Sequence, residues 1–324
     1  MIKILSIDGG GIRGIIPALV LAEIERRTGR STAHLFDLVA GTSTGGILAL
    51  GLTIPKTMGA PLYTARGLAE MYEREGSEIF SRPFLRGLFA CDNLTLTKYP
   101  SKGIEQVLLD YFGDSRLSQA VTNVLVTSYE VERRFPFFFK SPSARQRPDY
   151  DFPARDVARA TSAAPSYFQP MKLLSGTIAH HYTLIDGGVF ANNPAACALV
   201  EARTTFPGSD PFLIVSLGTG ALMRTIPLSI AKYWGSVLWA KPLLDIVFDG
   251  VSSTVDYQLR QLIGETSDHG KLYYRFQVEL KGHNHELDNT SPNNITALKG
   301  LAGDLIERES EELDKLCEQL IAKD

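Results

Sequence analysis

The sequence predicts an α/β protein in which a central, mostly parallel β-sheet is sandwiched between helices. Short apolar runs rich in β-branched residues alternate with stretches of helical periodicity along most of the 324 residues. Two of these runs end in glycine-rich turns that lead directly into a helix, at residues 8–14 and 41–45. A composition of 44% hydrophobic and 21% charged residues supplies enough apolar side chains for a large core.

The predicted elements alternate along the chain as such a fold requires. Strands are predicted at residues 2–8, 38–40, 123–131, 135–139, 182–185, 212–217 and 272–280. Helices are predicted at residues 15–27, 44–52, 65–79, 101–112, 156–164, 195–204, 226–248 and 296–322. The segments 141–152 and 282–294 are polar and are expected to be loops.

The first turn joins a β-rich run that ends at Asp8 to a helix. Its spacing matches the glycine fingerprint of dinucleotide-binding folds, but that fingerprint requires an acidic residue at the end of the next strand. Residues 41–43, Gly-Thr-Ser, stand there instead. Consecutive glycines also let backbone N–H groups turn toward one point, which predicts an oxyanion hole. A plain anion site at a helix N-terminus would use the same groups without chemistry.

The second turn places Ser43 between a short strand and a helix. A serine on such a sharp turn is pushed out of the regular backbone, with its hydroxyl exposed at the end of the sheet. Gly41 and Gly45 flank it, and their lack of a Cβ removes the collision that the turn would otherwise cause. The pattern therefore predicts a nucleophile elbow, although a serine that merely caps the helix would look similar.

An acidic residue also follows the predicted strand at residues 182–185. The run 182–185 delivers Asp186 into two glycines, a position from which a carboxylate can face a cleft. A turn aspartate that bonds its own backbone is the common alternative. Ser43 needs a base, and a Ser-Asp-His order could use His269, His283 or His285. We favour direct contact between Asp186 and Ser43, because His283 and His285 sit in a polar loop without the context of a strand end. The carboxylate would then need burial to raise its pKa.

Two segments combine aromatic, leucine and basic residues. Residues 80–89 lack a clean period and are interpreted as a loop packed over the core, in preference to a flap that touches lipid. Residues 226–248 have helical spacing, broken at Pro242, and contain both tryptophans of the chain, Trp234 and Trp239. We expect a helix that covers the sheet rather than an interfacial surface.

Taken together, the motifs resemble those of the patatin-like phospholipases. The resemblance is carried by residues 8–14, 41–45, 158–165, 186–188 and 192–194, in that order along the chain, with residues 287–294 similar to the family's C-terminal region. It implies a fold related to the acyl-carrier-protein transacylases, with residues 3–200 as the catalytic core. Residues 201–324 would form the C-terminal part of the same fold.

The same resemblance implies a mechanism. Ser43 would be the nucleophile and Asp186 the base, without a metal or other cofactor. The residues implied for the oxyanion hole and its surroundings are Gly9, Gly10, Gly11, Arg13, Gly14 and Thr44. The implied activity is a lipid acyl hydrolase that cleaves phospholipids, galactolipids or lysolipids through an acyl-serine intermediate. The alternatives are acyl transfer to an acceptor other than water, and a storage or lipid-binding protein with a residual site.

Charge and cysteine content limit the partners and the compartment. The formal net charge of −3 gives no electrostatic case for nucleic-acid binding. The partner that the resemblance implies is a membrane or micellar lipid, contacted peripherally. Three widely spaced cysteines, Cys91, Cys197 and Cys317, are interpreted as reduced thiols. Since no signal peptide and no run of 18 apolar residues is visible, we expect a cytoplasmic protein.

Overall fold

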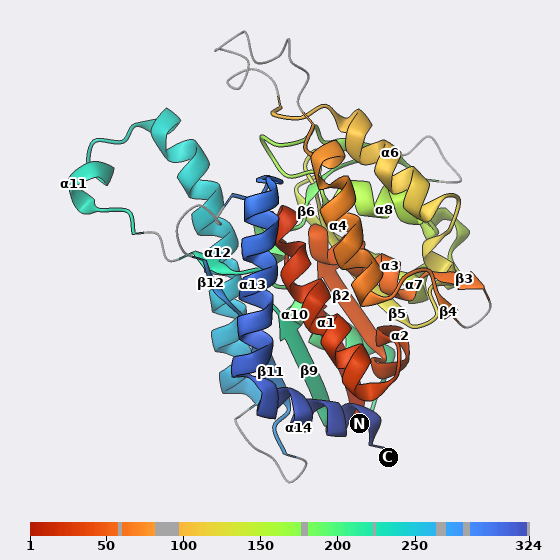
Figure 1. Ribbon diagram of the computed structural model, residues 1–324. Coiled ribbons are helices and arrows are strands. Elements are labelled where there is room, and N and C mark those ends of the chain that lie inside the picture. The colour runs from red at the N-terminus through yellow and green to blue at the C-terminus, as the bar shows by residue number, and fades with distance from the viewer. Residues whose placement is uncertain are drawn as a thin grey trace.

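The computed structural model describes residues 1–57, 60–81, 97–175, 181–222, 225–263, 270–280 and 286–322. Within these residues a sheet of eight strands lies between two layers of helices (Figure 1), which confirms the predicted α/β fold. The strands are β1 Ile2–Ile7, β2 Leu38–Thr42, β3 Pro55–Thr57, β4 Ala60–Pro61, β5 Asn123–Glu130, β6 Phe135–Lys140, β7 Met171–Leu174, β8 His181–Asp186, β9 Phe212–Leu217, β10 Ala221–Leu222, β11 Tyr273–Phe276 and β12 Glu279–Leu280. The helices are α1 Ile15–Thr28, α2 Thr32–Leu35, α3 Thr44–Thr53, α4 Ala65–Ile79, α6 Ser101–Phe112, α7 Ser141–Gln146, α8 Ala154–Thr161, α9 Gly188–Ala191, α10 Ala195–Thr205, α11 Leu228–Ala231, α12 Ser236–Ile263, α13 Pro292–Arg308 and α14 Ser310–Ile321.

The order of strands in the main sheet is β11-β9-β1-β2-β5-β8-β7, and β6 pairs with the other edge of β5. Strands β11, β9, β1, β2 and β5 are parallel, whereas β6 and β8 run antiparallel to β5. On β5, Thr127 pairs with Thr42 of β2, and the next residue, Ser128, pairs with Asp186 of β8. The C-terminal ends of β2 and β8 therefore meet head to head along one edge of β5.

The central strands are buried on both faces, as parallel strands usually are. Leu5 and Ile7 of β1 belong to a large apolar core with α1, α3, α4, α13 and α14. Ile4, which points to the opposite face, packs in a smaller core with α10 and the C-terminal part of α12. The alternation of side chains along β1, β2 and β9 thus separates two cores, and the ends of these strands are held rigidly between them.

Several elements differ from those predicted. Helix α12 continues through Pro242, because a proline costs a helix one hydrogen bond and need not end it. The predicted helix 296–322 begins earlier and is two helices, since Glu309 leaves helical dihedral angles (φ −99°, ψ 21°) while the apolar spacing persists on both sides. The expected loop 141–152 contains α7, and β7 was not predicted.

The segment 226–248 does not cover the sheet. Helix α11 and the N-terminal part of α12 stand away from the rest of the molecule (Figure 1), and no described side chain from residue 225 to residue 251 is buried. Only the C-terminal part of α12 packs on the core, through Val255, Leu259 and Ile263. The prediction of a covering helix was wrong here. Helical spacing indicates that one face of a helix is apolar, but it does not indicate what packs against that face. The predicted loop 80–89 falls almost entirely on residues 82–96, outside the described residues.

Candidate active site

Ser43 occupies a strained turn between β2 and α3. Its backbone has φ 53° and ψ −122°, a conformation that residues other than glycine rarely adopt. The Ser43 N–H group donates to Thr161 Oγ1 at 2.8 Å, and the Thr161 hydroxyl in turn donates to the carbonyl of Thr127 at 2.6 Å. Thr161, at the end of α8, thus ties the turn to β5. The sequence predicted a helix at residues 156–164 but did not indicate this role of Thr161.

Two glycines allow this turn to form where the backbone is most crowded. A Cβ on Gly41 would lie 2.1 Å from the carbonyl oxygen of Gly45. A Cβ on Gly45 would lie 2.2 Å from the carbonyl oxygen of Ile7 and 2.8 Å from that of Asp8. Because the obstructing atoms belong to the backbone of β1 and α3, they cannot move aside.

We therefore expect Gly45→Ala to lower the free energy of unfolding by about 3 kcal/mol, through overpacking against β1. Gly303→Ala is the matched control, because a Cβ at this helical glycine of α13 meets nothing within 4 Å. It should raise stability by about 0.5–1 kcal/mol. Urea unfolding followed by circular dichroism measures both. Equal effects of the two substitutions would contradict the packing described for the turn.

Asp186 meets Ser43 because of the head-to-head arrangement of β8 and β2. Ser43 and Asp186 line the same cleft, and the Ser43 hydroxyl lies close enough to the Asp186 carboxyl to lower its pKa. The Gly188 N–H group donates to Asp186 Oδ1 at 2.8 Å. The two side chains are 143 positions apart in the sequence (186 minus 43). The sequence predicted that Asp186 ends a strand, but not that this strand runs antiparallel to β5 and abuts β2.

Burial determines the protonation of Asp186, whose exposed fraction is 2%. Removal from water raises the pKa of this carboxyl from 3.8 to about 7, against the hydrogen bonds from Ser43 and Gly188, which lower the pKa. A carboxylate with a pKa near neutrality is a far stronger base than an exposed one. It can accept the proton of the Ser43 hydroxyl, which lines the same cleft.

Three backbone amides beside Ser43 are suited to hold an oxyanion. Gly10, Gly11 and Thr44 line the same cleft as Ser43, and within the described residues their N–H groups have no acceptor. Thr44 is the first residue of α3, so its amide also carries the positive end of the helix dipole.

The amide of Gly9 does not belong to this set. The prediction that it contributes to the oxyanion hole was wrong, because its N–H group donates to the carbonyl of Asn192 at 3.0 Å. Gly9 is instead needed for close packing, since a Cβ there would lie 2.4 Å from Asn192 Oδ1. The sequence offered no means of distinguishing a free glycine amide from one that a distant asparagine engages.

Arg13 and Gly14 shape the glycine loop from behind. Arg13 Nε donates to the carbonyl of Gly10 at 3.2 Å. In a trans peptide the N–H group points opposite to the carbonyl, so this bond directs the Gly11 N–H group away from Arg13. Gly14 allows α3 to approach, because a Cβ there would lie 2.2 Å from Thr44 Oγ1. We therefore assign both residues to positioning rather than to contact with the oxyanion.

Histidine is absent from the contacts of Ser43 and Asp186 in the described part of the chain. His34 bonds Ser31 Oγ at 2.6 Å, and His181 lies 3.4 Å from Glu132 at the opposite end of β8 from Asp186. The other four, at positions 180, 269, 283 and 285, lie outside the described residues.

Ser43 and Asp186 open into a cleft whose walls are mainly apolar. The apolar lining residues are Ile47, Tyr72, Ile79, Phe80, Ile104, Ala164, Tyr167, Phe168, Phe248 and Leu287. Ser162 adds a buried hydroxyl that has no hydrogen-bond partner among the described residues. Such a cleft fits a long hydrocarbon chain with a polar group near Ser43.

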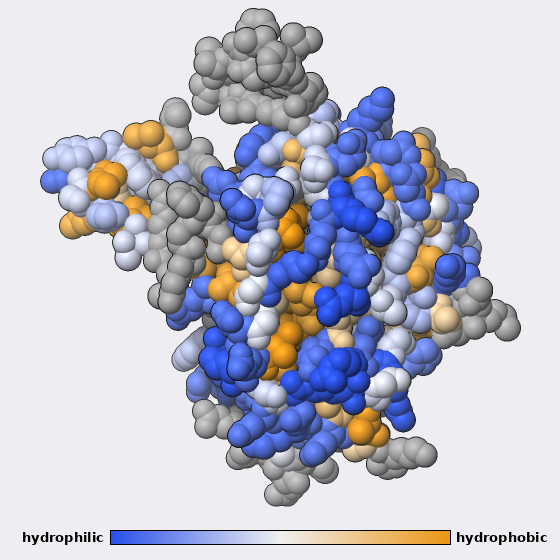
Figure 2. All heavy atoms as spheres, in the orientation of Figure 1, coloured by the Kyte–Doolittle hydropathy of each residue, from blue (hydrophilic) through white to orange (hydrophobic). Residues whose placement is uncertain are grey.

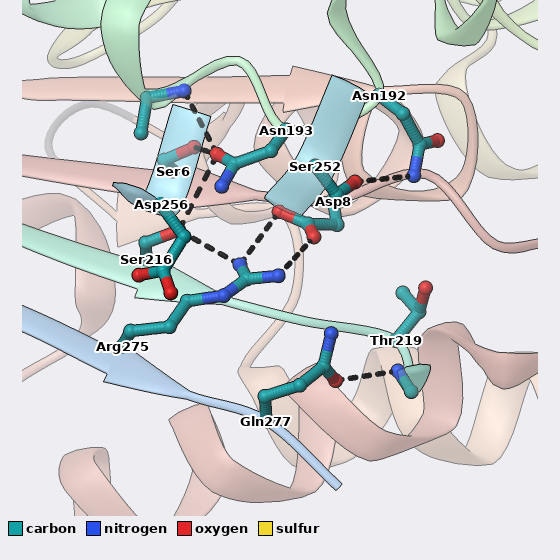
Figure 3. A network of polar contacts seen from close by, with 12 residues as sticks. Ser6, Asp8, Asn192, Asn193, Ser216, Thr219, Ser252, Asp256, Arg275 and Gln277 are labelled. Atoms are coloured by element: carbon teal, nitrogen blue, oxygen red, sulfur yellow. Dashed lines mark hydrogen bonds and ion pairs between the residues drawn. The ribbon is translucent and has the colours of Figure 1, made fainter. Parts of the chain in front are cut away.

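A buried ion pair supports the glycine loop on the side away from the cleft (Figure 3). Arg275 of β11 donates two hydrogen bonds to Asp8, at 2.9 and 2.6 Å, and a third to Ser216 Oγ at 2.8 Å. Both charged side chains are almost completely buried. Thr219 donates to the carbonyl of Gly9 at 2.6 Å, so the loop is held at both of its first residues. An arginine inside the apolar pattern 272–280 is the only sequence signal of this pair.

Comparison with known proteins places this site in a family. The family model described as patatin-like phospholipase matches residues 5–199, a range that includes the glycine loop, Ser43 and Asp186. The chain belongs to the patatin-like phospholipase family. Membership assigns it to the lipid acyl hydrolases at the level of the reaction class. The match across the glycine loop also favours the oxyanion interpretation of that loop over a dinucleotide site.

Individual patatins are similar over most of their length. The chain is 32% identical to patatin-like protein 2 of Arabidopsis thaliana, an alignment that covers 95% of this chain and 83% of the relative. It is 29% identical to patatin-T5 of Solanum tuberosum, over 95% and 84% of the two chains. A Solanum tuberosum relative named "Probable inactive patatin-3-Kuras 1" is also 29% identical, over 95% and 87%.

Two further observations describe the rest of the chain. Among the described helices, none is both long and apolar enough to cross a membrane. Cys197 and Cys317 are free thiols, and Cys91 lies outside the described residues.

Proposed function

We propose that the protein hydrolyses carboxylic ester bonds of phospholipids, galactolipids or lysolipids through an acyl-serine intermediate on a Ser43–Asp186 dyad. The observation that carries this proposal is that Ser43, on its strained turn, and the buried Asp186 carboxyl line one mainly apolar cleft, where burial raises the pKa of Asp186 to about 7. A catalytic base is most effective when its pKa lies near the working pH. The neighbouring amides and the apolar cleft supply the other parts that ester hydrolysis needs.

The reaction runs in two halves. Ser43 Oγ attacks the carbonyl carbon of the ester while its proton passes to Asp186, and the amides of Gly10, Gly11 and Thr44 stabilise the resulting oxyanion. Collapse of the tetrahedral intermediate breaks the ester bond, and Asp186 returns the proton to the departing alcohol. Water then attacks the acyl-serine with Asp186 again as base, which releases the fatty acid and restores Ser43.

The identity of the substrate is tested by exposing the protein to vesicles of defined phospholipids, galactolipids and lysolipids and measuring the products by mass spectrometry. We expect free fatty acid and the matching deacylated lipid. A fluorophosphonate probe should label Ser43, because it reacts with an activated serine. Addition of alcohol acceptors should give little transacylated product.

The competing functions give different results in the same assay. Predominant transfer to the added alcohol would favour an acyltransferase. Failure to release fatty acid, together with failure to label Ser43, would favour a storage or lipid-binding protein. Either result would overturn hydrolysis through Ser43.

A further inference from the structure

An apolar arm projects from the body of the protein on the side that carries α12. We use the name arm for residues 225–244, which comprise α11 and the beginning of α12. In Figure 2 the arm stands out from the rest of the surface and carries several hydrophobic patches. Leu228, Tyr233 and Leu238 are 80%, 76% and 58% exposed, respectively. Exposed apolar clusters of this kind mark interaction sites on soluble proteins.

The arm has internal order that does not depend on packing against the core. The described backbone hydrogen bonds of residues 230–239 end on residues 227–235, within the arm itself. Trp234 and Trp239 contact each other edge to face, with ring centroids 5.1 Å apart. Lys232 Nζ lies 4.7 Å from the centre of the Tyr233 ring. The arm is therefore a formed surface with aromatic rings and a lysine side by side.

The charge of the arm indicates the kind of surface that it meets. Residues 211–244 contain no aspartate or glutamate, whereas the arm contains Lys232 and Lys241. Lysine, tryptophan and tyrosine are the residues that lie at membrane interfaces, because each joins an apolar body to a polar or charged end. A surface that is apolar, aromatic and positively charged complements the interface of a bilayer that contains anionic lipid.

The arm is also continuous with the catalytic cleft. The same helix α12 carries Phe248, four residues beyond the arm, into the cleft wall. A Cβ added to Gly188, the residue whose amide bonds Asp186, would lie 3.0 Å from the Phe248 ring. The residue after Phe248, Asp249, attracts Arg13, whose Nε donates to the Gly10 carbonyl of the glycine loop. A bilayer that holds the arm would therefore lie close to the entrance used by its lipids.

We propose that the arm docks the protein on the surface of a bilayer that contains anionic lipid. This inference deepens the proposed function and rests on it, since a hydrolase of membrane lipids must reach them at the interface. Leu228, Leu238 and the aromatic rings enter the interfacial layer, and Lys232 faces the anionic headgroups. The arm determines access to bilayer substrate and takes no part in bond cleavage.

The test uses the only two tryptophans of the chain, which both lie in the arm, so that tryptophan emission reports on the arm alone. Ser43→Ala protein, which leaves the lipid intact, is mixed with phosphatidylcholine vesicles with and without phosphatidylglycerol. We expect a blue shift of the emission and flotation with the vesicles, stronger when phosphatidylglycerol is present. Adding Leu228→Ser and Leu238→Ser should weaken partitioning at least about tenfold.

The matched control adds Leu174→Ser and Leu262→Ser, which replace two leucines that are equally exposed, at 67% and 77%, but lie outside the arm. It should bind vesicles like the parent, and both pairs should keep the parent's melting temperature. In protein with Ser43 intact, the arm pair should lose hydrolysis of vesicle lipid while it keeps hydrolysis of a soluble short-chain ester.

Docking through the arm is overturned if the emission does not shift, or if the arm pair and the control pair bind vesicles equally. An emission shift that grows with protein concentration in the absence of lipid would also overturn it, and would make a second copy of the chain the partner. Each of these results leaves the proposed function untouched when the soluble ester is still cleaved. If the wild type failed to hydrolyse the soluble ester, that result would instead contradict the proposed dyad.

Discussion

Asp186→Asn is expected to lower kcat/KM for ester hydrolysis by about three to four orders of magnitude, close to the loss expected for Ser43→Ala. Asparagine keeps the shape of the side chain and can accept the hydrogen bond from the Gly188 N–H group, but it cannot take the proton of Ser43. The measurement is the initial rate with a soluble ester, which avoids effects on lipid binding. Thermal unfolding should show that both variants remain folded.

The pH dependence of the wild-type rate provides a second measurement of the same group. Only the deprotonated carboxylate is a base, so kcat/KM should rise about tenfold per pH unit below pH 7 and level off above it. The inflection follows from the pKa of about 7 that burial gives to Asp186. Asp186→Asn should remove this inflection from the residual rate. A profile that still turned near pH 7 in the variant would assign the titration to another group.

Histidine substitutions discriminate between a dyad and a triad. His34→Ala and His181→Ala should change kcat/KM less than about twofold, because neither side chain contacts Ser43 or Asp186. We expect the same of His283→Ala and His285→Ala. A loss comparable to that of Asp186→Asn in any of the four would replace the dyad by a triad.

The sequence was sufficient to predict the parts of the site that depend on local geometry. Gly41 and Gly45 indicated a sharp turn around Ser43, and the end of a strand before two glycines indicated an accessible carboxylate at Asp186. These features can be recognised in the sequence, because a backbone of unusual shape restricts the residue types that can form it. The order of strands and helices was predictable for the same reason, since each element carries its own periodicity.

The remaining features depend on which segments meet in space. Nothing in the sequence around Gly9 indicates that its N–H group donates to the carbonyl of Asn192. The hydrogen bond from the Ser43 amide to Thr161 Oγ1 joins residues that are 118 positions apart in the sequence. The orientation of β8 follows from its pairing with β5, and two strands with the same apolar pattern can pair in either direction. The arm could not be predicted, because helical spacing in residues 226–248 does not indicate whether another element covers their apolar side chains.

The buried pair of Asp8 and Arg275 is expected to give the largest effect on stability. Arg275→Met would leave the Asp8 carboxylate without its partner in a site removed from water, and should lower the free energy of unfolding by about 3–5 kcal/mol. Arg26→Met is the control, because Arg26 pairs with Glu23 on the surface with its side chain 70% exposed, and it should cost less than about 1 kcal/mol.

A double-mutant cycle separates the charge pair from simple loss of packing. Asp8→Asn removes the carboxylate charge, so adding it to Arg275→Met should restore part of the lost stability rather than lower it further. Urea unfolding at neutral pH measures all four proteins. Additive losses would show that Arg275 acts through its hydrocarbon stem and not through its charge. Because Asp8 immediately precedes the glycine loop, the single variants should also cleave a soluble ester more slowly, with kcat reduced more than KM is raised.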